Sequence, residues 1–183
     1  MSLPSSYNLL AKYPNRIGID VGSYRGDSIQ AFLDAGFEEV RSVDITFESW
    51  EFCCNRFNLF DKHEPLLEKI KLYQGDSSKM LWTMITGVDE PMTFWLDAHS
   101  QLLEDEGYSG GIDFPLLEEL KQIGNHPIKC HHILIDDIIV LSHPDVTGWS
   151  RKTIENAILA INPAYRFEYI ANPVKNNLLI ATV

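Results

Sequence analysis

The sequence has little positive charge, few cysteines and no apolar stretch long enough to cross a membrane. Its 15 lysines and arginines stand against 26 acidic residues, which gives a net charge of −11, and the basic residues are not clustered. Nucleic-acid binding and docking on anionic lipid both need clustered positive charge, so we predict neither partner. The lack of a signal peptide and of a membrane-length apolar segment likewise predicts no membrane association.

The few cysteines exclude a disulfide framework. Cys53 and Cys54 are neighbours in sequence and Cys130 stands apart, and none of the 3 has the spacing of a zinc site. A reducing, cytoplasmic location is therefore expected. With 183 residues, 45% of them hydrophobic, the chain is long enough to bury its own core. No repeat or linker interrupts it, so we expect one domain over residues 1–183.

The most informative stretch is Ile17–Ser28. A β-branched run from Ile17 to Val21 predicts a buried strand, and a turn with two glycines leads into helical periodicity over Ser28–Phe37. Such a turn lets the backbone approach a nucleotide-like ligand, and the helix start offers N–H groups to an anion. Tyr24 replaces the middle glycine of a dinucleotide fingerprint, and no Gly-Lys-Ser/Thr follows, which disfavours an NAD-linked oxidoreductase and an NTP-binding loop.

Strand-like and helix-like segments alternate along the rest of the chain. Strands are expected at 40–45, 70–73, 92–96, 132–135, 165–170 and 178–183, and helices at 48–60, 114–123 and 149–161. A further helix is expected to end at residue 86 with Ser77 or Ser78 as its cap, Asp113 is expected to cap the helix at 114–123, and 141–148 is expected to be a loop. This alternation predicts an α/β protein with a Rossmann-like, doubly wound, seven-stranded sheet, mostly parallel. The last two strands have no helix between them, so one strand near the C-terminus is expected to run antiparallel. Helix 48–60 is expected to bury an aromatic face that includes Phe52 and Phe60.

The glycine turn resembles motif I of the class I S-adenosylmethionine (AdoMet) methyltransferases, and most of all the catechol O-methyltransferase type. That pattern runs acid-x-Gly-small-Tyr-x-Gly-x-Ser, and this chain fills it with Asp20, Gly22, Ser23, Tyr24, Gly26 and Ser28. The resemblance implies the class I methyltransferase fold, AdoMet as cofactor, Tyr24 near the sulfonium and Ser28 near the methionine carboxylate. It also implies that Gly75, Asp76 and Ser77 lie beside the adenine.

Acidic residues lie at or just beyond the tips of the first five predicted strands. They are Asp20, Asp44, Asp76, Asp97, Asp136 and Asp137. Carboxylates gathered at one edge of a sheet repel each other unless a cation joins them, which a sulfonium or a divalent metal ion would supply. At the second strand tip, Asp44 is placed to accept both ribose hydroxyls. The alternative is that these aspartates are solvated or cap the helices that follow.

The resemblance also implies a metal site. Asp97 after the fourth strand and the pair Asp136-Asp137 after the fifth match the metal-binding positions of the catechol enzymes, so Mg²⁺ or another divalent cation is expected there. Such a metal ion would lower the pKa of a substrate hydroxyl and orient it. Ser100 occupies the position of the family's lysine base, which leaves His99 as the candidate catalytic base beside Asp97, with a purely structural role as the alternative.

These observations predict an AdoMet-dependent O-methyltransferase. The helical cap that precedes motif I in the catechol enzymes is missing, so the acceptor side is open, or is closed by residues 99–112 or by the second subunit of a homodimer. An open site favours a large or polar acceptor over a small flat catechol, so the expected acceptor is a sugar, a glycan or another small polyhydroxylated molecule. The alternative is a non-catalytic AdoMet-fold module within a larger assembly. His131-His132, beside Cys130, reads as a zinc half-site or, more simply, as a polar strand start.

Overall fold

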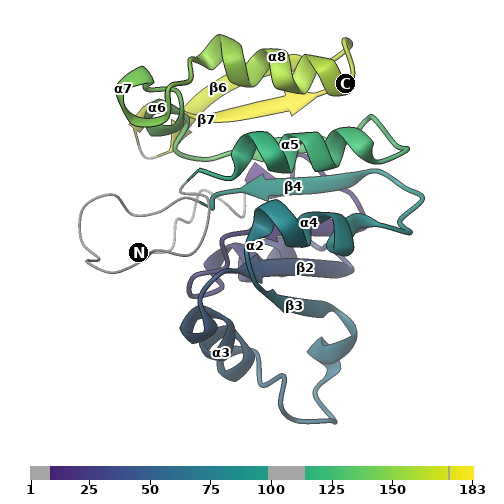
Figure 1. The fold of residues 1–183 in the computed structure, drawn as a ribbon. Helices are drawn as coiled ribbons and strands as arrows, with labels where there is room; N and C mark the ends of the chain where they lie inside the picture. Colours follow the sequence, from purple (N-terminus) through teal and green to yellow (C-terminus); the bar gives the residue numbers. More distant parts are fainter. Residues whose placement is uncertain (1–8, 99–113, 173) are drawn as a thin grey trace.

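A computed structural model describes residues 9–98, 114–172 and 174–183, and its strands form one seven-stranded sheet (Figure 1). The strand order is β3-β2-β1-β4-β5-β7-β6. The strands are β1 (Ile17–Val21), β2 (Glu39–Asp44), β3 (Ile70–Gln74), β4 (Met92–Leu96), β5 (His132–Ile135), β6 (Arg166–Asn172) and β7 (Val174–Thr182). Strands β1 to β5 pair in parallel, whereas β7 runs antiparallel to both β5 and β6. The predicted mixed sheet is confirmed, and β7 is the antiparallel strand.

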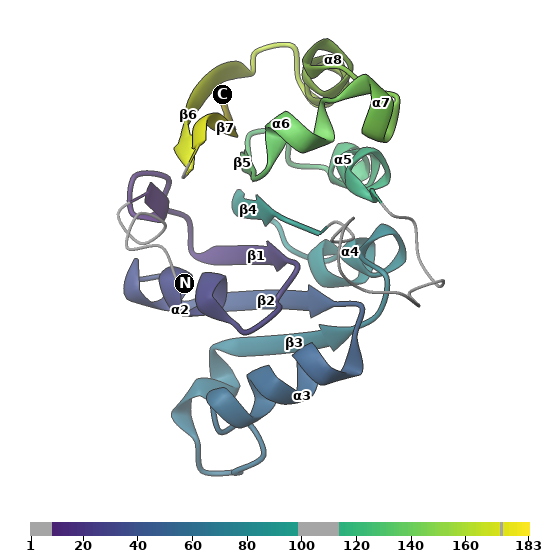
Figure 2. The same ribbon diagram turned by 90° about the vertical axis from the view of Figure 1, so that its left-hand side faces the viewer.

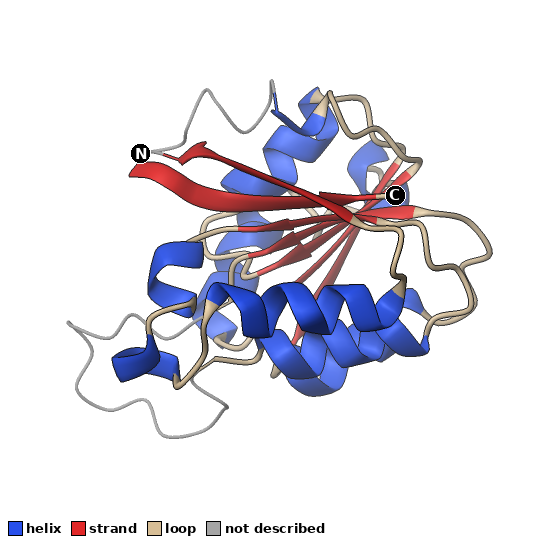
Figure 3. Ribbon diagram, turned by 90° about the horizontal axis from the view of Figure 1, so that it is seen from above, coloured by secondary structure: helices blue, strands red, loops and turns tan. Residues whose placement is uncertain are grey.

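Helices cover both faces of this sheet, as the views in Figures 2 and 3 show. The described helices are α2 (Asp27–Asp34), α3 (Phe47–Arg56), η1 (Pro65–Glu68), α4 (Ser77–Ile85), α5 (Leu116–Asn125), α6 (Ile138–Leu141), α7 (Pro144–Thr147) and α8 (Arg151–Ile161). Helices α4, α5 and α8 pack on one face, and α2 and α3 pack on the other. Among the described helices, none is long and apolar enough to cross a membrane.

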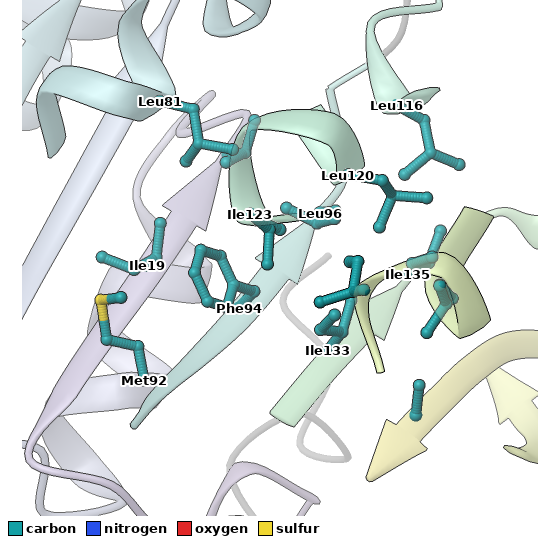
Figure 4. Packing of buried hydrophobic residues seen from close by; sticks show 14 of the residues in the cluster. Ile19, Leu81, Met92, Phe94, Leu96, Leu116, Leu120, Ile123, Ile133 and Ile135 are labelled. Carbon is teal, nitrogen blue, oxygen red and sulfur yellow. The ribbon is translucent and has the colours of Figure 1, made fainter. Parts of the chain in front are cut away.

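The core follows the two-residue periodicity of the strands. In β4, Phe94 and Leu96 face the α4–α5–α8 layer, whereas Trp95 between them belongs to the cluster on the other face (Figure 4). The central strands are buried on both faces, which is why they read as continuous apolar runs in the sequence. The carboxyl ends of these strands are thereby held in fixed register.

The structure corrects several details of the predicted elements. The expected loop at 141–148 contains the end of α6 and the whole of α7. The aromatic face expected for 48–60 is only partly core, because Phe52 is 46% exposed and Phe60 is 60% exposed. Helix α4 is capped by Asp76 and not by Ser77 or Ser78, since the Asp76 carboxylate accepts the Ser78 N–H. The predicted cap Asp113 lies outside the described residues.

Candidate functional site

The carboxyl ends of the parallel strands bring most of the predicted site residues to one edge of the sheet. In Figure 2 the arrowheads of β1, β2 and β3 point the same way, and the turns that follow them lie together. Backbone hydrogen bonds continue past the strand ends and fix these turns side by side. The Gly75 N–H donates to the Asp44 carbonyl at 2.8 Å, and the Asp97 N–H donates to the Val21 carbonyl at 2.9 Å.

The two glycines of the first turn are required by the chain itself. Gly22 has φ +98°, and a Cβ there would lie 2.8 Å from the Asp97 carbonyl oxygen. Gly26 has φ +78°, and a Cβ there would lie 2.8 Å from the Phe57 ring. Close packing on β4 and α3 therefore explains both glycines before any ligand is considered. Gly26 is also the N-cap of α2 and offers no side-chain cap to the amides of the first turn, where Ser28 lies.

Asp44 joins the end of β2 to the glycine turn. Its Oδ2 accepts the Tyr24 backbone N–H at 2.8 Å, and its Oδ1 accepts both the N–H and the hydroxyl of Thr46 at 2.9 Å. Tyr24 has a left-handed backbone conformation, with φ 42°, and the residue is 61% exposed to solvent. The structure thus brings Asp44 and the Tyr24 backbone together, and the contacts of these residues with ribose and the sulfonium stay predictions.

Asp20 lies beneath the same turn in a buried hydrogen-bond network. The Ser42 hydroxyl, from the paired position of β2, donates to Asp20 Oδ2 at 2.5 Å, and Ser42 Oγ lies 2.5 Å from Ser23 Oγ. Asp20 is fully buried, and burial raises the pKa of its carboxyl to about 7, against the opposing effect of Ser42 and Ser28. From the described residues, no hydrogen bond of good geometry reaches Asp20 Oδ1. The structure therefore buries the side chains of Asp20 and Ser23 beneath the glycine turn.

The turn after β3 also holds a carboxyl–serine pair. Asp76 Oδ1 accepts the N–H and the hydroxyl of Ser78, so the Asp76 side chain caps α4. Asp76 Oδ2 lies 3.3 Å from the Lys79 ammonium nitrogen. Hydrogen bonds from Ser78 and the charge of Lys79 together outweigh burial and lower the pKa of Asp76. The Ser77 hydroxyl instead donates to Glu119 of α5 at 2.5 Å.

Glu119 is a site neighbour that sequence reasoning missed. It lies on the apolar face of α5 and belongs to no motif, so the only signal was an acidic residue at a core position of a helix. Burial raises the pKa of its carboxyl to about 7, Ser77 opposes the rise and the charge of Asp76 adds to it. Nothing in the local sequence indicates that it meets Ser77.

The proposed metal-binding aspartates leave two adjacent strands. Asp97 follows β4 and Asp136 follows β5, and the Asp136 N–H donates to the Leu96 carbonyl at 3.1 Å. Asp136 Oδ1 accepts the Asp137 N–H, and Asp137 Oδ1 accepts the Asn177 side-chain amide at 2.7 Å. Within the described part of the chain, no three His, Cys, Asp or Glu side chains are arranged to hold a metal ion. The Mg²⁺ site that the resemblance implies is thus not supported by the described side chains and stays a prediction.

Two histidine predictions have different outcomes. His99, the candidate base, lies outside the described residues. His131 is buried at the opposite edge of the sheet, where its Nδ1 accepts the Met92 N–H at 3.1 Å and its ring lies 5.0 Å from that of His126. The zinc half-site has no support among the described side chains, and His131 packs in the core.

Comparison with known proteins identifies the fold. No family model matches the chain, and no curated protein matches it. An O-methyltransferase from Bacillus cereus in complex with SAH (S-adenosylhomocysteine) matches with a TM-score of 0.67 at 12% identity, over 99% of this chain and 81% of that one. An SAH-bound methyltransferase from Podospora anserina matches with a TM-score of 0.62 at 14% identity, over 97% of this chain and 76% of that one. An rRNA methylase from Streptococcus thermophilus matches with a TM-score of 0.52 at 14% identity, over 100% of this chain and 96% of that one.

The chain has the class I methyltransferase fold. This likeness, together with the observed strand order, confirms the fold predicted from motif I and from the alternation of strands and helices. It does not select an acceptor, because the similar structures include both an O-methyltransferase and an rRNA methylase.

Proposed function

We propose that this protein is an AdoMet-dependent O-methyltransferase. The observation that carries the proposal is the hydrogen bond from the Tyr24 N–H to Asp44 Oδ2 at 2.8 Å. It sets a carboxylate that can accept ribose hydroxyls directly against a glycine turn at the carboxyl edge of a parallel sheet, where α/β proteins bind nucleotide-like ligands. The SAH-bound structures of the same fold support this choice of cofactor.

The Asp44 carboxylate can accept a ribose diol if it gives up its hydrogen bond from the Thr46 hydroxyl. Each carboxylate oxygen has two acceptor positions, and Oδ2 uses one of them for Tyr24. Oδ1 holds both donors of Thr46, but the Thr46 hydroxyl also lies 2.8 Å from Ser49 Oγ and can turn its hydrogen there. A bound ribose can then donate one hydroxyl to each oxygen while the backbone bonds stay in place.

The reaction needs a nucleophile, a leaving group and a proton acceptor. The acceptor hydroxyl oxygen attacks the sulfonium methyl in line, the carbon–sulfur bond breaks with its electron pair on sulfur, and SAH leaves as a neutral thioether. The hydroxyl proton passes to a base, for which we propose Asp97 or His99, the residues that follow β4 in the sequence. Catalysis rests chiefly on holding the oxygen and the methyl group in line at short range.

The acceptor we propose is a sugar, a glycan or another small polyhydroxylated molecule. An rRNA methylase shares the fold, but the net charge of −11 opposes binding to a polyanion. Residues 1–183 are proposed to act as one domain in the cytoplasm, in a homodimer if a second subunit closes the acceptor side. The competing proposal is a binding module that holds AdoMet without turning it over.

SAH binding tests the proposed cofactor. The wild-type protein should bind SAH in calorimetry, and Asp44→Ala should weaken this binding by about 100-fold or more, because two charge-assisted hydrogen bonds of about 1.5–3 kcal/mol each are lost. Asp34→Ala, which removes an exposed carboxylate at the end of α2, is the matched control and should bind as the wild type does. A wild-type protein that is folded by circular dichroism and does not bind SAH would reject the proposal. SAH binding without methyl transfer to sugars, phenols or RNA would favour the binding module.

Mg²⁺ assistance is a separate prediction, which rests on the resemblance alone. If Asp97, Asp136 and Asp137 hold a divalent cation, Asp136→Asn should weaken metal binding in calorimetry while leaving SAH affinity within about twofold. Their side chains would have to rearrange, since Asp137 is bonded to Asn177 as placed. Full methyl transfer in excess chelator would contradict this prediction and leave the rest of the proposal intact.

A further inference from the structure

We infer that Glu119 is a positioning residue of the adenine subsite, and that its proton sets whether the Ser77 hydroxyl donates or accepts a hydrogen bond toward the base. This inference rests on the proposed function, because it needs an AdoMet-like ligand whose adenine lies beside the turn after β3. It adds a residue from α5, the helix that follows β4 in the chain, to a subsite otherwise built by the β3 turn.

The geometry isolates the pair from solvent. Glu119 is 1% exposed and Ser77 is 6% exposed, and the Ser77 hydroxyl lies 2.5 Å from Glu119 Oε1. Leu81 of α4 and Leu116 and Leu120 of α5, which flank them, are all buried in the cluster shown in Figure 4. A buried carboxyl group is costly without a hydrogen-bond partner, and the Ser77 hydroxyl supplies one to Glu119. The two side chains therefore act as one unit.

The turn carries this unit to the edge of the proposed ribose site. The Gly75 N–H donates to the Asp44 carbonyl at 2.8 Å, so the residues after Gly75 lie beside the residue proposed to bind ribose. Asp76 cannot replace Glu119, because its Oδ1 caps α4 through Ser78 and its Oδ2 pairs with Lys79 at 3.3 Å. Among the described residues, the charged group that acts on Glu119 is thus Asp76, which itself pairs with Lys79.

The hydrogen bond between a carboxyl group and a hydroxyl can run in either direction. An ionised Glu119 can only accept, so the Ser77 hydrogen is committed to it and the Ser77 oxygen is left to accept from a donor such as the 6-amino group of adenine. A neutral Glu119 can donate to Ser77, which frees the Ser77 hydrogen for an acceptor on the base. Burial places the pKa of Glu119 at about 7, so both states occur near neutral pH.

A comparison of two ligands tests this inference. Calorimetry gives the affinity for SAH and for its 6-oxo analogue, S-inosyl-L-homocysteine, between about pH 8 and about pH 5.5. Both ligands have the same amino-acid end, so the ratio of their affinities cancels titration elsewhere in the site. In the wild type the preference for SAH should fall about tenfold as the pH is lowered, the size expected for one reversed hydrogen bond.

Three variants separate positioning from stability. Glu119→Gln cannot ionise, so its preference should stay constant with pH within about twofold, and Ser77→Ala should lose the pH dependence as well. Glu118→Gln removes the exposed neighbour on the same helix and should follow the wild type. A preference that does not change with pH in the wild type, or changes equally in Glu119→Gln, would overturn the inference and leave the proposed function standing. A folded wild type that binds neither ligand would overturn both.

Discussion

At the scale of single residues, the glycines differ in why they exclude a side chain. Gly22 has φ +98° and a Cβ would lie 2.8 Å from the Asp97 carbonyl oxygen. Gly36 has φ +90° and a Cβ would meet nothing within 4 Å. The backbone conformation disfavours a side chain at both positions, whereas a collision with β4 occurs only at Gly22. The two positions therefore allow strain and collision to be separated.

Gly22→Ala should destabilise the protein more than Gly36→Ala. The left-handed conformation costs about 1–2 kcal/mol at either site, and overlap with a neighbouring strand adds about 1–3 kcal/mol at Gly22. Urea unfolding of both variants measures the difference. Equal free energies of unfolding would show that the Asp97 backbone moves aside at little cost.

At the scale of elements, α8 shows how a helix start is specified. The Ser150 hydroxyl accepts the Thr153 N–H at 3.2 Å, and the Thr153 hydroxyl accepts the Ser150 N–H at 3.2 Å, a reciprocal capping box. The sequence predicts this helix from residue 149, whereas it begins at Arg151 with Trp149 packed against Phe114. The cap and not the periodicity sets the first residue.

Ser150→Ala should lower the free energy of unfolding by about 1 kcal/mol, because an amide N–H of the first turn loses its partner. Lys152→Ala, in the same exposed turn, is the control. It removes only a surface ion pair with Glu155, and its effect should stay below about 0.5 kcal/mol. Chemical denaturation measures both, and a Ser150→Ala effect no larger than that of the control would show that water replaces the cap.

At the scale of the whole molecule, buried carboxyl groups and a buried histidine change the stability in opposite directions as the pH changes. Asp20 and Glu119 have pKa values of about 7, above the ordinary 3.8 and 4.5, so their contribution to stability is present at low pH and is lost as the pH rises to about 7. Burial and the neighbouring His126 lower the pKa of His131 from 6.5 to about 4. Its contribution is therefore present above 6.5 and is lost as the pH falls to about 4.

Removing His131 should reveal the pH dependence of stability that the buried carboxyl groups cause. On going from about pH 7.5 to about pH 5, His131→Gln should gain stability relative to the wild type by an amount on the order of 1–2 kcal/mol, since an unfolded histidine would bind a proton there and a folded one would not. A glutamine oxygen can still accept the Met92 N–H. Urea unfolding at both pH values measures the change, with the exposed His63→Gln as the control. Identical pH dependence in His131→Gln and the wild type would show that His131 is protonated in the folded state.

The sequence by itself determined most of the fold and which strand ends carry the candidate site residues. Apolar runs, glycine turns and strand-tip aspartates are local patterns, so β4 and β5 were predicted with their observed bounds and Asp44 was placed at a strand end. The antiparallel strand followed from the missing helix between β6 and β7. These inferences succeed because backbone conformation and burial on a strand depend mainly on neighbours in sequence.

Only the tertiary structure decided which side chains meet. Ser77 and Glu119 are 42 residues apart in the chain, and Asp137 and Asn177 are 40 apart, so no local pattern connects them. Helix packing brings α5 over α4, and the antiparallel course of β7 brings Asn177 to the end of β5. Whether a strand-tip aspartate bonds a neighbouring turn, caps a helix or lies beneath a turn was settled by those contacts, because a carboxyl group takes whichever hydrogen-bond donors the folded chain places nearest to it.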